Sequence, residues 1–250
     1  ITMPKKNIYS VINLFDRLGI EVEDITINEI GDLYAFKNEK INDSIGVIVN
    51  IGHNITTVSL FNKGIIVKNS ILQMGGSNIT NDLSYIFKLD NLDAEMVKEK
   101  FAVASSNYAS CNDIIEIKNI KLNQKEVSEV VESRLDEILT FVKKEIFSLT
   151  DKQISYIIVT GGTVNMNCFD VELKKILGDN ISIGKVKMLG ATENKYSSVI
   201  GNVVYYINKL KLKGENSTMV DSTNETILSS PKKNTNETMI SKVINFFANE

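Results

Sequence analysis

The chain has 250 residues, 43% of them hydrophobic, with a formal net charge of -3 and a pI near 5.5. That apolar content is enough for one large core or two modest ones. The acidic balance argues against a nucleic-acid binder, which usually carries a basic face. No apolar run approaches the ~18 residues needed to span a bilayer, and no secretory signal precedes the first predicted helix.

The cysteines and the first residue indicate the cellular context. Cys111 and Cys168 lie far apart without the spacing of a metal site. We therefore expect reduced, buried thiols in a cytosolic protein. The chain begins with Ile1 rather than Met, and we expect a segment to have preceded it.

The N-terminal part predicts two helices and a strand. Lys6–Gly19 has apolar residues at helical spacing, with Gly19 as a natural C-terminal cap. A strand is expected near Val22–Ile27 and a short helix around Glu29–Phe36. The polar residues Asn38–Ser44 are expected to form a connector.

The stretch from Gly46 to Gly76 is the most informative part of the chain. Apolar, β-branched runs alternate there with turn residues, which predicts a three-stranded antiparallel meander that ends in a glycine pair. The first turn, residues 50–57, is polar and rich in hydroxyl groups. Such a turn can direct backbone N–H groups and the hydroxyls of Thr56 and Thr57 at a phosphate, although on its own it is more typical of an ordinary hairpin.

Helices and a polar loop follow the meander. Helices are predicted at Asn78–Lys88 and Asp93–Phe101, a Ser/Asn-rich loop at Ala104–Asn112, and a strand at Ile114–Ile120. A capping-box signature at residues 123–126 opens a long helix. Its apolar positions form one core-facing stripe: Val127, Val130, Val131, Leu135, Ile138, Phe141, Val142 and Ile146.

An α/β pattern returns after this helix. Ile154–Val159 is a short apolar strand that suits the centre of a sheet. It leads into a T-G-G sequence at residues 160–162, which by itself is typical of a strand-to-helix turn. A helix from about Phe169, a strand near Ile181–Val186 and a last helix at Glu193–Leu212 complete the folded part.

The C-terminal tail has the composition of a tether followed by an amphipathic helix. Residues 213–236 are rich in Ser, Thr and Asn and predict a disordered linker. Residues 237–250 carry an apolar stripe typical of a reversible membrane anchor, although a helix that docks on a protein would look similar. The membrane-facing side chains would be Met239, Ile240, Val243, Ile244, Phe246 and Phe247.

Four motifs in order and spacing resemble the actin-like ATPase superfamily and, within it, the FtsA family of bacterial cell-division proteins. The family pattern has an aliphatic strand with D-I-G-G-G-T-T-D, then G-G with I-T and D-[IL], then A-E-x-x-K, and a strand with T-G-G. The matching segments are Gly46–Thr57, Gly75–Leu83, Ala94–Lys98 and Ile154–Gly162. The resemblance covers roughly residues 1–212.

The resemblance implies an α/β fold, the second domain of an actin-like (ribonuclease H-like) ATPase, with a site for ATP and Mg²⁺. Gly52, Thr56 and Thr57 would form the phosphate-binding turn. Glu95 and Lys98 would approach the ribose and adenine, although their spacing also suits a routine helix-surface pair. Gly161 and Gly162 would pack on the adenosine, since glycine permits close approach of backbone to ligand. The implied residues are Gly52, Thr56, Thr57, Gly75, Gly76, Glu95, Lys98, Gly161 and Gly162.

Two departures from the family pattern bear on catalysis. Asn50 stands where the family has an Asp that would help hold metal-bound water, and an amide lacks the charge for that role. His53 and Asn54 replace glycines, and His53, the only histidine, is expected to be a solvent-facing turn residue rather than a general base. We therefore assign no catalytic residue or metal ligand. With most of the first domain missing, nucleotide binding by this chain is expected to be weak or absent.

The resemblance also implies a domain organisation. Residues 1–43 would close the first actin-like domain, and residues 44–212 would form the second. An α+β subdomain would be inserted at about residues 89–149. The linker at 213–236 and the amphipathic membrane-targeting helix at 237–250 would follow.

The implied function is in cell division. A protein of this family would tether FtsZ filaments to the cytoplasmic face of the membrane at the septum, bind the FtsZ C-terminal tail through its inserted subdomain, and self-associate into filaments in a nucleotide-dependent way. The alternative is a PilM-like actin-fold membrane scaffold of another assembly system. A sugar kinase or a chaperone-type ATPase is a third possibility, disfavoured by Asn50 and by the lack of a visible catalytic base.

Overall fold

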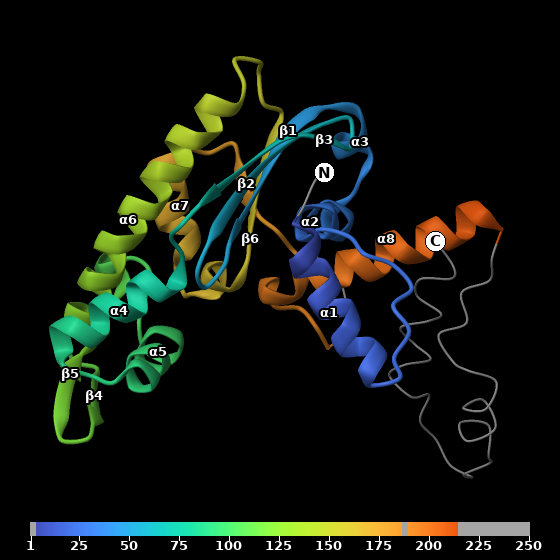
Figure 1. Ribbon diagram of the computed structural model, residues 1–250. Coiled ribbons are helices and arrows are strands. Elements are labelled where there is room, and N and C mark those ends of the chain that lie inside the picture. The colour runs from blue at the N-terminus through green and yellow to red at the C-terminus, as the bar shows by residue number, and fades with distance from the viewer. Residues whose placement is uncertain (1–3, 187–189, 215–250) are drawn as a thin grey trace, which may run out of the picture.

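A five-stranded mixed sheet forms the centre of the computed structural model, which describes residues 4–186 and 190–214 (Figure 1). The strand order is β3-β2-β1-β6-β7. The strands are β1 (Ile45–Ile51), β2 (Thr56–Asn62), β3 (Ile65–Leu72), β6 (Tyr156–Thr160) and β7 (Ile181–Ile183). The first three are antiparallel neighbours, which confirms the predicted meander, and β6 runs parallel to both β1 and β7.

Helices cover both faces of the sheet. The helices α6 (Gln124–Leu149) and α7 (Phe169–Leu177) lie on one face, and α2 (Asn28–Phe36) and α8 (Ser197–Lys213) lie on the other (Figure 1). The strand β1 is buried on both sides, because Val47 and Val49 join the core with α6 while Ile48 joins the core with α2 and α8. This double burial explains why β1 reads as a continuous apolar run in the sequence.

The helices α2 and α8 cross at a contact between backbones. A Cβ atom on Gly201 would lie 1.7 Å from the carbonyl oxygen of Gly31, and one on Gly31 would lie 2.2 Å from the carbonyl oxygen of Ser198. Any side chain at either position would therefore force the helices apart. This close crossing holds α2 against the end of the sheet that carries the candidate site.

The chain between β3 and β6 builds a lobe at one end of the sheet (Figure 1). It contains α4 (Gly76–Phe87), α5 (Asn91–Lys100), the short helix η1 (Ser106–Tyr108), a hairpin and α6. The single strand predicted at Ile114–Ile120 is wrong, because the structure has two strands there, β4 (Ile114–Ile117) and β5 (Ile120–Asn123). Lys118 and Asn119 between them both have positive φ, 48° and 69°, as in a two-residue hairpin turn.

The long helix agrees with its prediction. The side chain of Asn123 accepts a hydrogen bond from the backbone N–H of Lys125 and so caps the start of α6. Most of the predicted apolar stripe is buried, but Phe141 is 40% exposed. The helices predicted near residues 29, 78, 93, 169 and 193 are also confirmed within a few residues.

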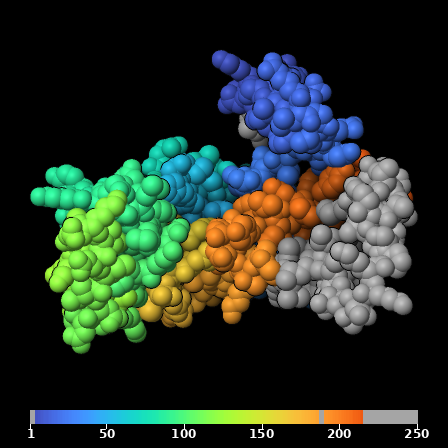
Figure 2. Space-filling view, turned by 90° about the horizontal axis from the view of Figure 1, so that it is seen from below, coloured from blue at the N-terminus to red at the C-terminus, as the bar shows by residue number. Residues whose placement is uncertain are grey.

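The N-terminal segment differs from its prediction in two places. The expected helix is present as α1 (Lys5–Arg17), but Val22–Ile27 is not a strand, since no strand lies beside it among the described residues. The expected connector contains the short helix α3 (Glu39–Asp43), which Asn38 caps by accepting from the N–H of Ile41. None of the side chains of α1 is buried, and the segment projects from the body of the molecule (Figure 2).

Three further expectations concern burial and the tail. Both cysteines are free, as expected, but Cys111 is exposed and Cys168 half-buried, so their predicted burial is wrong. The helix α8 extends to Lys213 and ends at Gly214, whereas residues 215–236 of the predicted linker and the terminal stripe lie outside the described residues. Among residues 4–186 and 190–214, no helix combines the length and apolar character needed to cross a lipid bilayer.

Candidate functional site

The turn between β1 and β2 closes against the first turn of α4. Within the turn, the N–H of Gly52 donates to the carbonyl of Ile55 at 3.0 Å. The N–H of Gly76 donates to the carbonyl of Gly52 at 2.9 Å, and the N–H of Ser77 donates to the carbonyl of His53 at 2.7 Å. The turn thereby satisfies two of the backbone donors that a helix leaves unpaired at its N-terminus. The glycine pair at the start of α4 is therefore a structural partner of the turn.

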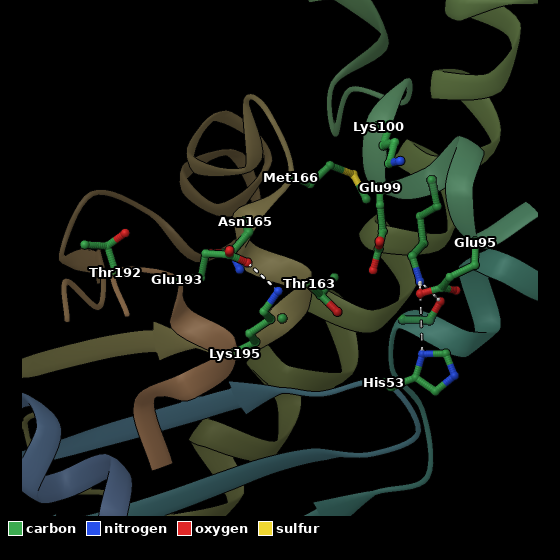
Figure 3. A pocket seen from close by; sticks show the side chains of 13 residues that line it. His53, Glu95, Glu99, Lys100, Thr163, Asn165, Met166, Thr192, Glu193 and Lys195 are labelled. Atoms are coloured by element: carbon green, nitrogen blue, oxygen red, sulfur yellow. Dashed lines mark hydrogen bonds and ion pairs between the residues drawn. The ribbon is translucent and has the colours of Figure 1, made fainter. Parts of the chain in front are cut away.

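A cleft of about 730 Å³ opens beside this turn (Figure 3). One wall comes from α5 and the start of α4, and the other from the T-G-G turn and the residues that precede α8. Because the cleft lies beyond the carboxyl ends of the parallel strands β1 and β6, it occupies the usual position of a ligand site in an α/β sheet. Its lining residues are His53, Gly76, Glu95, Lys98, Glu99, Lys100, Gly162, Thr163, Asn165, Met166, Thr192, Glu193 and Lys195.

The pair Glu95 and Lys98 forms, but it is not a routine surface pair. Lys98 is only 6% exposed, and its Nζ donates to Glu95 Oε1 at 2.6 Å, to Thr80 Oγ1 at 2.9 Å and to the carbonyl of Gly76 at 3.2 Å. Burial tends to raise the pKa of Glu95, but hydrogen bonds from Lys98 and Thr80 outweigh it and lower the pKa overall. The pair thus ties α5 to the N-terminus of α4 and places a carboxylate on the cleft wall.

The T-G-G turn packs directly on the end of β1. Gly161 has a φ of +102°, and a Cβ atom there would lie 2.4 Å from the carbonyl oxygen of Ile51. Only glycine fits both conditions. Gly162 follows at the start of the short helix η2 (Gly162–Asn165) and lines the cleft.

The remaining residues of the implied site lie elsewhere. Thr56 is fully buried, and its hydroxyl donates to the carbonyl of Met74 at 2.9 Å. Thr57 lines a second cleft of about 940 Å³ on the other side of the turn, together with Asn50, Gly52 and apolar side chains of α1. Gly52 therefore lines the second cleft and not the first, and the two threonine side chains do not line the first cleft either.

Asn50 has a partner that the sequence did not reveal. Its Nδ2 donates to Asp32 Oδ2 at 2.7 Å and to Ser198 Oγ at 3.2 Å. Asp32, on α2, is 2% exposed, and burial raises its pKa. A single acid in a short helix gives no spacing signal, which is why only the structure could identify it. The amide of Asn50 is thus committed to a neighbouring carboxylate and does not fit a Mg²⁺ ligand set, so no metal step is assigned to it.

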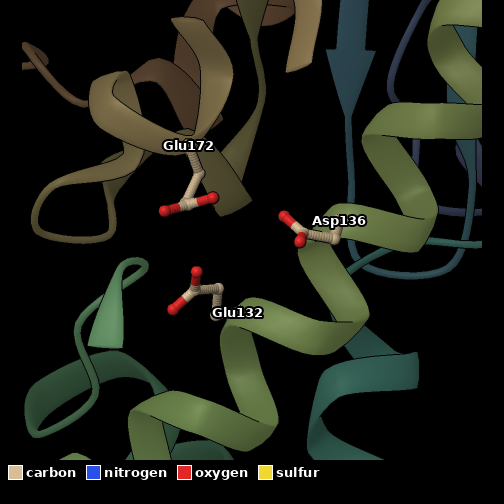
Figure 4. Close-up of side chains that lie close together, drawn as sticks. All are labelled: Glu132, Asp136 and Glu172. Carbon is tan, nitrogen blue, oxygen red and sulfur yellow. The ribbon is translucent and has the colours of Figure 1, made fainter. Parts of the chain in front are cut away.

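A second cluster of acids lies away from the cleft, between α6 and α7 (Figure 4). The carboxylates of Glu132, Asp136 and Glu172 come within 4.8 Å of one another. The ammonium of Lys175 already lies among them, at 2.9 Å from Glu132, 3.4 Å from Asp136 and 2.8 Å from Glu172. The lysine supplies the positive charge that a metal ion would otherwise provide.

The family model described as cell division protein FtsA matches residues 47–201. The chain belongs to the FtsA family. The FtsA of Bacillus subtilis is 28% identical over 225 residues, which are 86% of this chain and 50% of that protein. The FtsA of Escherichia coli K12 is 21% identical over 226 residues, covering 82% of this chain and 54% of the relative. The chain therefore spans about half the length of the FtsA proteins that it matches.

Solved structures confirm the actin-like fold. MreB5 of Spiroplasma citri bound to ADP superposes with a TM-score of 0.67 at 15% identity, over 84% of this chain and 68% of that one. An archaeal actin homologue gives 0.55 at 15% identity, over 73% and 55%. A PilM–PilN type IV pilus biogenesis complex gives 0.59 at 16% identity, over 84% and 58%. At these identities the likeness concerns the fold alone.

Proposed function

We propose that this chain belongs to a protein that binds ATP in the cleft beside the β1–β2 turn, assembles in a nucleotide-dependent way, and tethers FtsZ filaments to the cytoplasmic face of the membrane at the division site. The observation that carries the proposal is that three separate motifs of a chain in the FtsA family meet at one cleft. These motifs contribute Gly76, the pair Glu95 and Lys98, and Gly162. The MreB5 structures with ADP and with AMPPNP support nucleotide as the ligand class.

The residues around the cleft suit a nucleotide. Gly162 leaves room for a flat base or sugar, and the carboxylate of Glu95 can accept hydrogen bonds from ribose hydroxyls. Lys100 and Lys195, together with the buried Lys98, give the cleft cations that can attract phosphate groups. The β1–β2 turn, residues 52–55, offers no carboxylate for a metal ion, so nucleotide binding is proposed without a hydrolytic step.

Filling the cleft from Gly162 tests the nucleotide proposal. A Cβ atom at this position would lie 3.7 Å from the Cβ of Lys195, an ordinary contact, so the backbone accepts a side chain. We expect Gly162→Leu to lower ATP affinity at least about tenfold, because the isobutyl group occupies ligand space, and Gly162→Ala to change it by less than about threefold. Isothermal titration calorimetry measures both. Equal ATP affinity in the wild type and both variants would place the ligand elsewhere.

A groove between α4 and α6 is the proposed docking surface for the FtsZ tail. It measures about 480 Å³ and combines an apolar strip, Ile86 and Val130, with charged sides. Arg134 is held there by two hydrogen bonds to Asp82, at 2.5 and 2.9 Å. An amphipathic helix or strand of a peptide could lay its apolar side chains between these helices.

Adjacent residues of α4 provide a matched pair for the FtsZ test. Ile86 lines the groove and is 53% exposed, whereas Tyr85 is 86% exposed and does not line it. We expect Ile86→Asp to abolish saturable binding of a labelled FtsZ C-terminal peptide in fluorescence anisotropy, and Tyr85→Asp to preserve it. If the folded wild type does not bind the peptide at all, tethering of FtsZ through this chain is overturned, and the groove would serve another partner.

Membrane attachment is proposed for the terminal stripe, which includes Phe246 and Phe247. A single short helix of this kind binds lipid weakly, and self-association would strengthen it through multivalency. Sedimentation with anionic vesicles should carry down the full chain but not a variant that ends at residue 236. Equal sedimentation of both would exclude the stripe as the anchor.

A further inference from the structure

The only histidine of the chain lies at the entrance of the cleft. His53 occupies the tip of the β1–β2 turn, where its side chain is 57% exposed and lines the cleft (Figure 3). Its main chain is fixed, because its carbonyl accepts the N–H of Ser77 at 2.7 Å. The ring is therefore presented to the cleft from a rigid position.

An acid lies beside this ring. Nδ1 of His53 lies 3.8 Å from Oε1 of Glu95, and the same oxygen accepts a hydrogen bond from Lys98. Glu95 thus lies next to two groups that can both be positive, and Figure 3 shows the side chains of His53 and Glu95 close together. With Nδ1 directed at the acid, Nε2 on the opposite side of the imidazole is the nitrogen that can meet a ligand.

The other charged side chains around the cleft come from its walls and not from the β1–β2 turn. The α4 residues in contact with the turn, Gly76 and Ser77, are neutral. The remaining charges of the cleft walls come from α5 and from the segment before α8: Glu99, Lys100, Glu193 and Lys195. The β1–β2 turn itself contributes one ionisable side chain to the cleft, that of His53.

We propose that His53 is a proton-dependent contact for the phosphate groups of the nucleotide. The inference rests on the proposed function, because it requires nucleotide in this cleft. An imidazolium donates a charge-assisted hydrogen bond to phosphate, whereas the neutral ring does not carry the charge. Since histidine changes charge between about pH 5 and 8, binding of phosphorylated nucleosides tightens as the pH falls through this range.

A comparison of ligands and pH values tests the contact. The tag-free chain and its His53→Gln variant are titrated with ATP and with adenosine at pH 6.0 and 8.0, at constant ionic strength. We expect the wild type to bind ATP about tenfold more tightly than the variant at pH 6.0 and within about twofold at pH 8.0. Adenosine should not distinguish the two proteins. The variant also corrects for titration of the terminal phosphate of ATP itself.

Nuclear magnetic resonance provides a second, direct measurement, because one histidine gives one imidazole signal. The pH midpoint of the His53 signal should rise when ATP saturates the cleft and stay unchanged with adenosine. A midpoint that ATP does not move, or equal ATP affinity of wild type and His53→Gln at pH 6.0, would overturn the proposal while leaving nucleotide binding intact. Because binding to this chain is expected to be weak, both proteins are titrated up to millimolar ATP, and absence of binding by the folded wild type over that range would overturn both proposals.

Discussion

At the residue scale, the most informative group is the buried carboxylate of Asp32. It accepts hydrogen bonds from Asn50 Nδ2, Ser197 Oγ and Ser198 Oγ, each at 2.7 Å. The donors come from β1 and α8, and Asp32 itself lies on α2, so three elements meet at one side chain. An acid at position 50 would bring two carboxylates into contact. The amide of Asn50 is therefore what allows a buried acid at position 32.

The exchange of these two groups is a testable prediction. Asn50→Asp should lower the free energy of unfolding by about 2–4 kcal/mol at pH 7, because two adjacent buried carboxylates cannot both ionise without cost. The double variant Asp32→Asn/Asn50→Asp should recover most of that loss. Urea unfolding at pH 7 measures both.

The same urea titrations can separate the effect of an added charge from the effect of its burial on the free energy of unfolding. Asn69 Nδ2 also donates to a carboxylate, that of Glu29, but this pair is exposed, so Asn69→Asp should cost less than about 1 kcal/mol. The pKa of Asp32 is raised in the folded state, chiefly by burial. A group of this kind costs stability as the pH rises above its unfolded pKa, so the deficit of Asn50→Asp should shrink at pH 5. Strict additivity of the two single variants would contradict the coupling.

At the element scale, one lysine joins α6 to α7. Lys175 lies among Glu132, Asp136 and Glu172, and Glu172 is only 1% exposed. Burial tends to raise the pKa of Glu132, but hydrogen bonds from Ser106 and Lys175 outweigh it and lower the pKa to about 2. That lowering stabilises the fold at pH values above the ordinary glutamate pKa, and the stabilisation is lost as the pH falls toward 2.

Removing this cation should destabilise the connection. We expect Lys175→Met to lower the free energy of unfolding by about 2 kcal/mol at pH 7, because Glu172 then remains buried without a counter-charge. The difference from the wild type should narrow at pH 4, where the carboxylates begin to take up protons. Lys174→Met, one residue earlier on the exposed side of α7, is the matched control and should have little effect in the same urea titrations. An equal loss in both variants would mean that general charge, not the cluster, is responsible.

The elements also show how far the sequence could be interpreted. Periodicity predicted the meander, the core stripe of α6 and the order of helices, because each depends on residues close in the chain. It missed the β4–β5 turn, since Lys118 gives no turn signal beside Asn119. It also wrongly made a strand of Val22–Ile27, because extended backbone becomes a strand only when another strand pairs with it.

Some of the residues implied for the nucleotide site lie together in the structure and others do not. Gly76, Glu95, Lys98 and Gly162 do line one cleft, as the motifs implied. The hydroxyl of Thr56 instead binds a backbone carbonyl, which no spacing rule could indicate. The Asp32 contacts were equally hidden, because they join residues up to 166 positions apart.

At the scale of the whole molecule, α1 stands apart from the two cores. It contributes no buried side chain, and Val11, Leu14 and Leu18 are each more than half exposed. A helix with little tertiary burial is stabilised mainly by its own hydrogen bonds, and short isolated helices are marginal in water. In this chain, α1 therefore has an exposed apolar surface of the kind that is usually covered by another element.

Hydrogen exchange followed by mass spectrometry tests this difference. We expect the amides of α1 to exchange at least about 100-fold faster than those of α6, whose buried stripe faces the main core. The helix α2 is the internal control, because it is shorter than α1 yet packs against α8, and it should be protected. Protection of α1 equal to that of α2 would show that another part of the chain covers it.

The glycine contact between α2 and α8 determines how this molecule can deform. Because main chain touches main chain at Gly31 and Gly201, no side chain can change rotamer to absorb a displacement. Sliding of one helix along the other would drive a Cα into a carbonyl oxygen, whereas rotation about the contact keeps the distance. We therefore expect α2 to rotate about this crossing more readily than it slides along α8, and Asp32 is the next residue after Gly31. Movement at the cleft would reach α2 as a change of angle and not as a translation.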